Sequence, residues 1–211
     1  MDKYTHPDYE NIALVTIDTQ NDFSLPDAVC EIKNTFDIIP NMVKLLGKFR
    51  ERNKPIIHIV RFYKEDASNV DICRKKKVQE GLNVVVPNSE GAELVNELKP
   101  NDDMLDAEKL LAGEVQEIGS NEHVIYKPRW GAFYETPLDG FLKERGITTL
   151  VFSGCNFPNC PRTSIYEASE RDYRLIVIED AISGIYDKGI EELKNICCEV
   201  IKTDEFLKIF N

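Results

Sequence analysis

The sequence predicts an α/β fold: a single-domain, Rossmann-like three-layer sandwich in which helices flank a mainly parallel sheet. Short apolar runs such as residues 11–18 (NIALVTID) alternate with stretches of helical periodicity such as residues 36–53. This alternation is typical of βαβ units. The 211 residues contain no internal repeat and no linker, and they suffice for one normal hydrophobic core. We therefore assign residues 1–211 to a single domain.

Strands are predicted from continuous apolar runs, because a strand that is buried on both faces of a parallel sheet carries few polar side chains. Runs of this kind occur at residues 11–18, 55–60, 123–127, 147–154, 174–180 and 198–203.

Helices are predicted where apolar side chains recur at spacings of three and four residues. The clearest stripe lies in residues 36–53 and consists of Ile38, Met42, Leu45, Leu46 and Phe49. Weaker patterns predict helices at residues 90–98, 138–145, 163–172, 185–196 and 204–210. The rest of the polar region between residues 61 and 121 shows no regular pattern.

Composition argues against several classes of partner. The chain has 37 acidic and 26 basic side chains, a formal net charge of -11, and binding to nucleic acid requires the opposite excess. The basic run RKKK at residues 74–77 is interpreted as a solvated helix face. We find no secretory signal, no apolar stretch of about 20 residues, and no CxxC among the six cysteines. These observations predict a cytoplasmic protein with free thiols that binds neither nucleic acid nor membrane.

Candidate functional residues follow the predicted strands. Asp18 ends the first strand, Lys127 ends the third, and the loop at residues 155–160 follows the fourth. Arg61 and Asp180 follow two others. Because ligands of open parallel sheets bind at the carboxyl ends of the strands, the sequence places an acid, a base and a thiol at one edge.

Cys160 is the candidate nucleophile. Pro161 suits the first position of a helix, which would make Cys160 the N-cap residue. Free backbone N–H groups and the helix dipole would then lower the pKa of the thiol, and Lys127 would add positive charge. Asp18 is the candidate general base. The alternative is that Cys160 is a small buried core residue. The presence of Asp18 and Lys127 at the same edge favours the nucleophile.

Five side chains are candidates for lining a substrate pocket: Phe23, Arg61, Trp130, Phe133 and Phe157. Aromatic side chains beside such a crevice belong to the core equally often. Arg61 could pair with a substrate carboxylate or form a surface ion pair. Asp22 and Asp180 are interpreted as structural.

Three segments, in order, resemble the isochorismatase-like cysteine hydrolase superfamily: LVTIDTQNDF, VIYKPRWGAFYETPLDGFLKERGI and LVFSGCNFPNCPRTSIYEASERDYRLIVIEDAISG. The resemblance implies a triad of Asp18, Lys127 and Cys160. It also implies hydrolysis of a C–N bond in a small amide or ureide, through a covalent thioester-type intermediate and without a cofactor.

The resemblance further implies an oxyanion hole formed by the N–H groups of Asn156 and Cys160, with a cis peptide bond just before it. By motif position the cis bond is Cys155–Asn156. The family usually has threonine in this loop, whereas this chain has Phe157 and Pro158, so Phe157–Pro158 is a competing position.

Nicotinamidases of this superfamily bind a metal through an aspartate and histidines after the second strand. The corresponding segment here, HIVRFYKEDASNVD, lacks that pattern, so we expect no metal and favour the amidohydrolase branch over nicotinamidase. The middle of the chain resembles the ureide-hydrolysing members. Family members commonly form oligomers, which implies a homodimer or homotetramer acting on a small molecule.

Three alternatives remain open. The first is an isochorismatase-type hydrolase that cleaves a vinyl ether. The second is a thiol redox protein that uses Cys155 and Cys160, although CxxC is absent. The third is a non-catalytic binding protein on the same scaffold.

Overall fold

The computed structural model describes residues 3–211; residues 1 and 2 of the predicted domain lie outside them. It contains a seven-stranded sheet with the strand order β3-β4-β2-β1-β5-β6-β7, in which only β3 is antiparallel to its neighbour. The predicted fold class and all six predicted strands are confirmed. The strands are β1 (Ile12–Ile17), β2 (Ile56–Val60), β3 (Gln116–Gly119), β4 (Glu122–Tyr126), β5 (Thr149–Gly154), β6 (Arg174–Ile182) and β7 (Glu199–Ile201).

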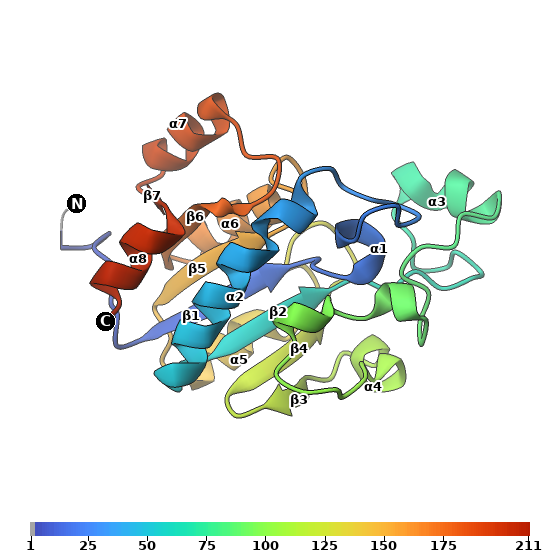
Figure 1. Cartoon of the computed structure of the whole chain (residues 1–211), viewed down its shortest axis with the longest axis horizontal. Coiled ribbons are helices and arrows are strands. Elements are labelled where there is room, and N and C mark those ends of the chain that lie inside the picture. Colours follow the sequence, from blue (N-terminus) through green and yellow to red (C-terminus); the bar gives the residue numbers. More distant parts are fainter. Residues whose placement is uncertain (1–2) are drawn as a thin grey trace.

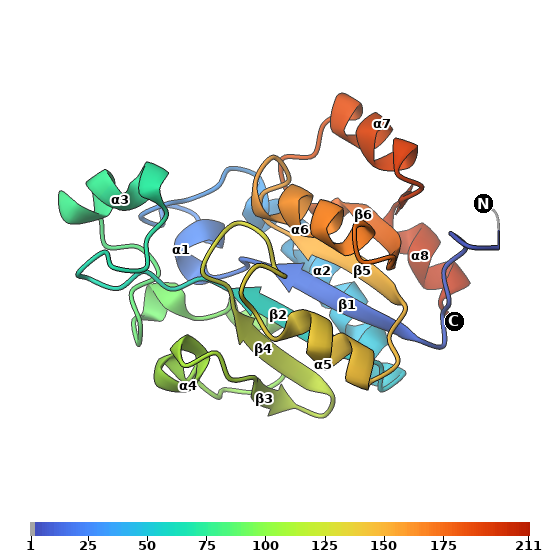
Figure 2. The ribbon, with the colours of Figure 1, turned by 180° about the vertical axis from the view of Figure 1, so that it is seen from behind.

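Helices cover both faces of the sheet. One face carries α2 (Thr35–Glu51) and α8 (Thr203–Ile209), which lie in front of the strands in Figure 1. The other face carries α5 (Leu138–Glu144), α6 (Cys160–Ser169) and α7 (Asp187–Asn195), seen in front in Figure 2. None of the helices within residues 3–211 has the length and hydropathy needed to cross a membrane.

The predicted apolar stripe of α2 packs as expected. Ile38, Met42, Leu45, Leu46 and Phe49 are all buried between α2 and the sheet. The ring of Phe49 also lies 4.8 Å from that of Phe210, which follows α8. The apolar stripe of α2 is therefore buried against both the sheet and α8, and this burial stabilises the helix.

The region between β2 and β4 differs most from the prediction. Sequence periodicity suggested one helix at residues 90–98, but the structure has two 3₁₀ turns, η1 (Glu90–Ala92) and η2 (Asn96–Leu98). The residues between them instead pair with the segment after β1, where Asn21 donates to the Glu93 carbonyl and Val95 to the Thr19 carbonyl. The structure also contains α1 (Asn21–Ser24), α4 (Ala107–Leu111) and β3, none of which we predicted, and α3 (Ile72–Gln79), which includes the basic run that we interpreted as a helix face.

The topology creates a switch point between β1 and β5. From β1 the chain builds outward through β2 and β4, then returns to place β5 on the other side of β1. Loops that leave β1 and β5 therefore diverge, and such a point is where open α/β sheets bind ligands. In Figure 1, α1 and α3 lie beyond this end of the strands.

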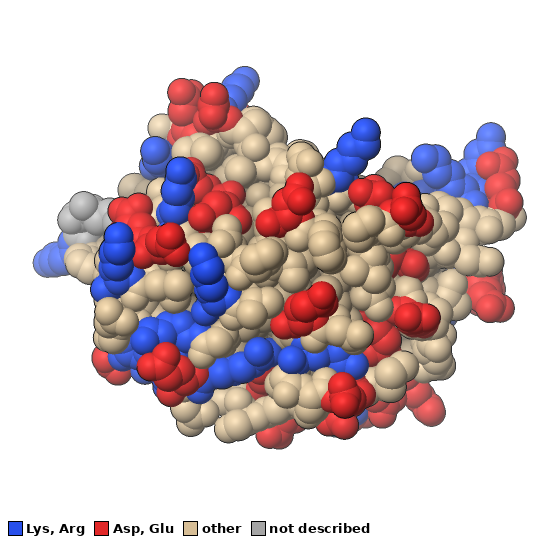
Figure 3. Space-filling view, viewed as in Figure 1, with Lys and Arg blue, Asp and Glu red and all other residues tan. Residues whose placement is uncertain are grey.

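The surface carries both signs of charge. Over the face drawn in Figure 3, acidic side chains are interspersed with basic ones, and basic side chains form a band along its lower part. Side chains of both signs therefore lie side by side on this face.

A polar network crosses the buried middle of the sheet. Thr16 Oγ1 lies 2.8 Å from His58 Nδ1, and His58 Nε2 lies 2.8 Å from Glu122 Oε1. Arg50 makes a bidentate contact with Glu122, at 2.7 and 2.8 Å. Burial alone would raise the pKa of Glu122, but the hydrogen bonds from Arg50 and His58 lower it to about 2.

We expect this network to set the acid stability. Because the folded-state pKa of Glu122 lies below its ordinary value, its stabilising contribution is complete above about pH 5 and is lost as pH falls towards 2. Glu122→Gln should lower the free energy of unfolding at pH 7 by on the order of 3 kcal/mol. Urea unfolding between pH 7 and pH 3 measures this, and the variant should show the weaker pH dependence.

Glu51→Gln is the matched control, because Glu51 pairs with Lys48 at the surface. Its stability curve should follow that of the unchanged protein within about 0.5 kcal/mol. Equal effects of the two substitutions would contradict the assigned role of Glu122.

Gly154, the last residue of β5, permits close approach of β5 to β1. Its φ is +115°, and a Cβ built there would lie 2.3 Å from the carbonyl oxygen of Ile17. Gly154→Ala should therefore destabilise the fold by at least about 2 kcal/mol. Gly47→Ala should instead stabilise it by about 0.5–1 kcal/mol, because Gly47 is helical with open space around it. Thermal unfolding of both variants tests the contrast, and equal shifts would refute it.

Candidate active site

Asp18 is the first residue after β1 and has a left-handed backbone, with φ of 53°. Aspartate tolerates this conformation better than most residues. The Asp18 N–H donates to the carbonyl of Ile59, and the thiol of Cys155 donates to the Asp18 carbonyl. These contacts fix the direction in which the Asp18 carboxylate leaves the sheet.

Lys127 follows β4 and is fully buried. Its Nζ lies 2.9 Å from Asp18 Oδ2 and also donates to the carbonyl of Arg129 at 3.3 Å. A buried ammonium without a carboxylate partner would be strongly unfavourable, so the two side chains depend on each other. The structure thus brings together Asp18 and Lys127, the two charged residues that the sequence placed at one edge of the sheet.

Cys160 is the first residue of α6, with Asn159 at the N-cap position and Pro161 at the second helical position. The prediction that Cys160 itself is the N-cap was wrong by one residue. Pro161 is accommodated because the N–H groups of the whole first turn lack partners within the helix. Ser164 Oγ donates to the Cys160 carbonyl and accepts from the Ala132 N–H, which ties the start of α6 to the segment after Lys127.

A small cavity joins the loops that leave β1 and β5. Its volume is about 20 Å³, enough for one water molecule. Its walls include two of the three candidate catalytic residues, Asp18 and Cys160, and both residues of the cis peptide. The lining residues are Asp18, Phe23, Ile32, Arg74, Cys155, Asn156 and Cys160.

The cis peptide bond is Cys155–Asn156, the position that the motif indicated. Within residues 3–211, the backbone N–H groups of Asn156 and Cys160 have no acceptor, whereas the N–H of Phe157 donates to the Ser183 carbonyl. Two unpaired donors therefore flank the cavity. An oxyanion hole needs unpaired donors of this kind, so the assignment of these two N–H groups stays a prediction.

The expectation of a lowered thiol pKa was wrong. Burial and the neighbouring Asp18 carboxylate raise the pKa of Cys160 to about 11, against the opposing effect of Lys127 and Arg61. The expectation counted the helix terminus and Lys127 but not the burial of the sulfur or the charge of Asp18. The resting thiol is therefore protonated, with a carboxylate near it that can accept the proton.

The structure places the five pocket candidates in different surroundings. Phe23 lines the cavity, and Arg61 is buried close enough to Asp18 and Cys160 for their charges to act on it. Trp130 stacks under the guanidinium of Arg74 at 4.5 Å, outside the cavity wall. Phe133 and Phe157 are buried in the hydrophobic core and are not among the residues that line this small cavity, so their place in a substrate pocket stays a prediction. Phe157 is held there by an edge contact with Tyr186, at 5.4 Å between ring centroids.

Sequence reasoning missed Arg74. The interpretation of residues 74–77 as a solvated face holds for the three lysines, which are exposed, but the Arg74 side chain is 33% exposed and reaches the cavity. Its Nη1 donates to the Tyr63 hydroxyl at 2.7 Å and lies 3.8 Å from Asp71. Asp71, three residues earlier in the chain, was the signal that could have identified this arginine as inward-facing.

Asp22 and Asp180 have the structural roles predicted for them. Asp22 accepts the N–H of Val85 at 2.6 Å, which holds the loop opposite α1. Asp180 lies within β6 and accepts both the N–H and the hydroxyl of Thr203, at the start of α8.

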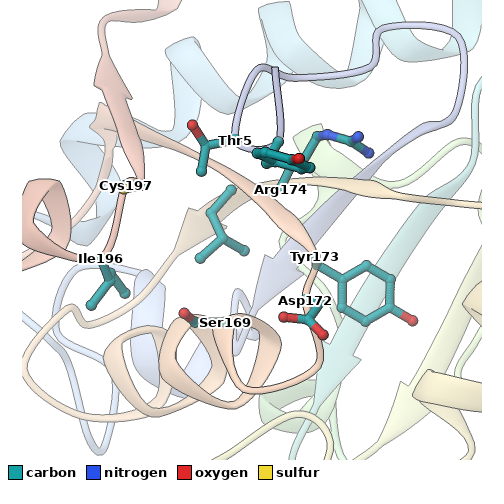
Figure 4. A pocket seen from close by; sticks show the side chains of 9 residues that line it. Thr5, Ser169, Asp172, Tyr173, Arg174, Ile196 and Cys197 are labelled. Atoms are coloured by element: carbon teal, nitrogen blue, oxygen red, sulfur yellow. The ribbon is translucent and has the colours of Figure 1, made fainter. Parts of the chain in front are cut away.

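A larger hollow of about 350 Å³ lies at the opposite edge of the sheet, beside the first residues of β6 and the residues that precede β7 (Figure 4). Its walls include Ser169, Asp172, Arg174 and Cys197. It lies at the amino ends of the strands, away from the switch point where open α/β sheets bind ligands, and the described residues that line it include no lysine. The small cavity beside Cys160 is therefore the candidate active site. No three His, Cys, Asp or Glu side chains of residues 3–211 are grouped so as to hold a metal ion.

Fold and site together define a class: an α/β protein with a buried thiol, carboxylate and ammonium at the switch point of its sheet. The isochorismatase domain model matches residues 12–205 of the chain. The chain therefore belongs to the isochorismatase family.

Individual relatives agree with this assignment. A probable inactive nicotinamidase of Arabidopsis thaliana is 31% identical over 194 residues, covering 89% of this chain and 90% of the relative. The crystal structure of an isochorismatase family protein from Desulfovibrio vulgaris superimposes with a TM-score of 0.80 at 28% identity, covering 94% of this chain and 97% of that one. A ureidoacrylate amidohydrolase of Methylorubrum extorquens is 40% identical over 75 residues, 35% of this chain and 30% of the relative.

The raised pKa of Cys160 predicts how its alkylation depends on pH. The rate of reaction with iodoacetamide should rise with an apparent pKa near 11, above the value of about 8.5 for a free thiol. Asp18→Asn removes a negative charge that raises this pKa, so the apparent pKa should fall. Peptide mass spectrometry locates the modification and measures its rate.

Cys73 is exposed and serves as the internal reference in the same samples. Its profile should be the same in both proteins. If Asp18→Asn leaves the apparent pKa of Cys160 unchanged or raises it, the electrostatic coupling of the two groups is refuted.

Proposed function

We propose that this protein is a cysteine-dependent hydrolase that cleaves a C–N bond of a small amide or ureide. The observation that carries the proposal is the placement of Asp18 and Cys160 on one cavity, with Lys127 Nζ 2.9 Å from the Asp18 carboxylate. This combination supplies a nucleophile, a proton acceptor and a fixed positive charge.

In the first half of the reaction, Asp18 accepts the thiol proton while Cys160 Sγ attacks the carbonyl carbon of the substrate. A C–S bond forms, and the N–H groups of Asn156 and Cys160 hold the developing oxyanion. As the intermediate collapses, the C–N bond breaks and Asp18 returns the proton to the leaving nitrogen. An acyl- or carbamoyl-thioester remains on Cys160.

In the second half, Asp18 accepts a proton from a water molecule that attacks the thioester carbon. The C–S bond breaks, Cys160 regains its proton, and the acid or carbamate leaves. Lys127 holds the Asp18 carboxylate in one orientation through both halves, and its charge favours the ionised form of the Cys160 sulfur.

The ureidoacrylate amidohydrolase relative supports ureide chemistry over other reactions of the family. The alternative of a vinyl-ether hydrolase has no comparable role for a cavity-lining thiol. The redox alternative requires a reactive Cys155, but that thiol is fully buried and donates a hydrogen bond to the Asp18 carbonyl. The Arabidopsis relative is described as a probable inactive nicotinamidase, which supports the non-catalytic alternative. The experiment below tests that alternative.

Other predictions stand beside this proposal. We predict one domain over residues 1–211, a homodimer or homotetramer, and a cytoplasmic location. We also predict a small-molecule substrate, activity without a metal or other cofactor, and no binding to nucleic acid or membrane.

The test is turnover of a panel of small amides and ureides by the unchanged protein and by Cys160→Ala, Asp18→Asn and Lys127→Met. Each substitution should lower kcat/KM by at least about a thousandfold, because the three groups act as one unit. Mass spectrometry of the quenched reaction should show an adduct on the peptide that contains Cys160.

Cys30→Ala is the matched control, because Cys30 is a half-buried thiol outside the cavity, and it should retain full activity. Thermal unfolding checks that the variants are folded, above all Lys127→Met. Turnover that survives Cys160→Ala would refute the proposal. Cleavage of a vinyl ether with no amide turned over would favour the isochorismatase alternative.

A further inference from the structure

The guanidinium of Arg61 is bonded on one edge and free on the other. Its Nη1 donates to Asp71 Oδ2 at 2.9 Å and to the Pro128 carbonyl at 3.0 Å. Within residues 3–211, its Nε and Nη2 have no acceptor, although the side chain is only 1% exposed. Buried N–H groups without a partner are rare and unfavourable, so this edge is suited to a ligand.

The free edge belongs to a side chain beside the reacting groups. Arg61 follows β2, next to the end of β1, and its backbone N–H donates to the side chain of Gln20. Burial alone would disfavour the charged form, but Tyr63, Asp18, Cys160 and Asp71 together raise the pKa of Arg61. The guanidinium therefore remains charged within electrostatic reach of the candidate nucleophile.

A second arginine extends this positive region. Arg74 lines the same cavity as Cys160 and is held by Tyr63 and Trp130. Asp71 lies beside both arginines and neutralises only one of them. Because Asp18 and Lys127 cancel each other, the site keeps one excess positive charge in a chain whose formal net charge is -11.

The Nε and Nη2 donors of a guanidinium point in parallel and match the two oxygens of a carboxylate. Asp71 Oδ2 and the Pro128 carbonyl occupy Nη1 and so fix the plane of the group. The free edge is therefore oriented before a ligand arrives, which lowers the entropic cost of binding.

We propose that Arg61, assisted by Arg74, binds a carboxylate of the substrate, so that the substrates are small amides or ureides that carry a carboxylate near the scissile C–N bond. This inference rests on the proposed function for the meaning of "substrate". The anion subsite itself can be tested without turnover.

The experiment compares two alkylating reagents of nearly the same size, the anion iodoacetate and the neutral iodoacetamide. For each thiol, the ratio of the two rates cancels the fraction of thiolate and reports the preference for an anion. The ratio at Cys160 should exceed that at the exposed Cys197 by at least about tenfold, since a charge-assisted bidentate contact contributes only near Cys160.

Arg61→Gln should bring the ratio at Cys160 to within about threefold of the reference, and Arg74→Gln should lower it by a smaller factor. Arg129→Gln is the matched control: it removes one exposed arginine two residues after Lys127 and should leave the ratio unchanged. If Arg61→Gln does not fold, Arg74→Gln carries the test, because its side chain is partly exposed.

A second readout uses intact substrate-like compounds. N-carbamoylglycine should protect Cys160 from iodoacetamide, and its neutral carboxamide should protect it far less. Equal protection by the two compounds, or an anion preference at Cys160 no greater than at Cys197, would overturn the carboxylate subsite. An equal loss of preference in Arg129→Gln and Arg61→Gln would do the same. None of these outcomes depends on turnover, so they are separate from a failure of the proposed hydrolase activity.

Discussion

The contact between Lys127 and Asp18 is the interaction on which the rest of the site depends. The two residues are 109 positions apart in the chain, and both side chains are withdrawn from solvent. Neither charge is tolerable there without the other, so β1 and β4 must present them in register although β2 lies between those strands. The polar network of Arg50, His58 and Glu122 ties β2 to β4 within the sheet and so supports that register.

The switch point brings the thiol to this pair. Gly154 allows β5 to approach β1 closely, and the chain then turns through the Cys155–Asn156 bond into α6. Cys155 adds a second tie, because its thiol donates to the Asp18 carbonyl. The loops after β1 and β5 are thus bonded to each other, and Cys160 opens α6 on the cavity wall that includes Asp18.

The sequence predicted most of the sheet because buried parallel strands are continuous apolar runs, and the run at 11–18 has few other interpretations. It predicted Asp18, Lys127 and Cys160 at one edge because strand ends identify that edge. It did not predict β3, a four-residue edge strand that is mostly not buried and pairs with the next strand along the chain. It also did not predict the 3₁₀ turns at residues 90–98, where the chain pairs with the distant segment after β1. Arg74 was missed for a related reason: whether a side chain turns towards a cavity or towards solvent depends on contacts such as that with Tyr63, which spacing along the chain does not encode.

The electrostatics of the site have a consequence for how reaction would begin. Asp18 raises the pKa of the thiol whose proton it is positioned to accept, so the resting sulfur is a poor nucleophile. Arg61 and Lys127 act in the opposite direction on the same sulfur. The cavity has room for about one water molecule, so in the proposed reaction wall residues such as Arg74 must move for a substrate to enter. Excluding water strengthens every charge interaction in the site, including those of Arg61 and Lys127 with the developing thiolate. A thiol kept protonated in the resting site reacts slowly with unrelated electrophiles, so in the proposed mechanism its proton passes to Asp18 only as the substrate carbonyl is attacked.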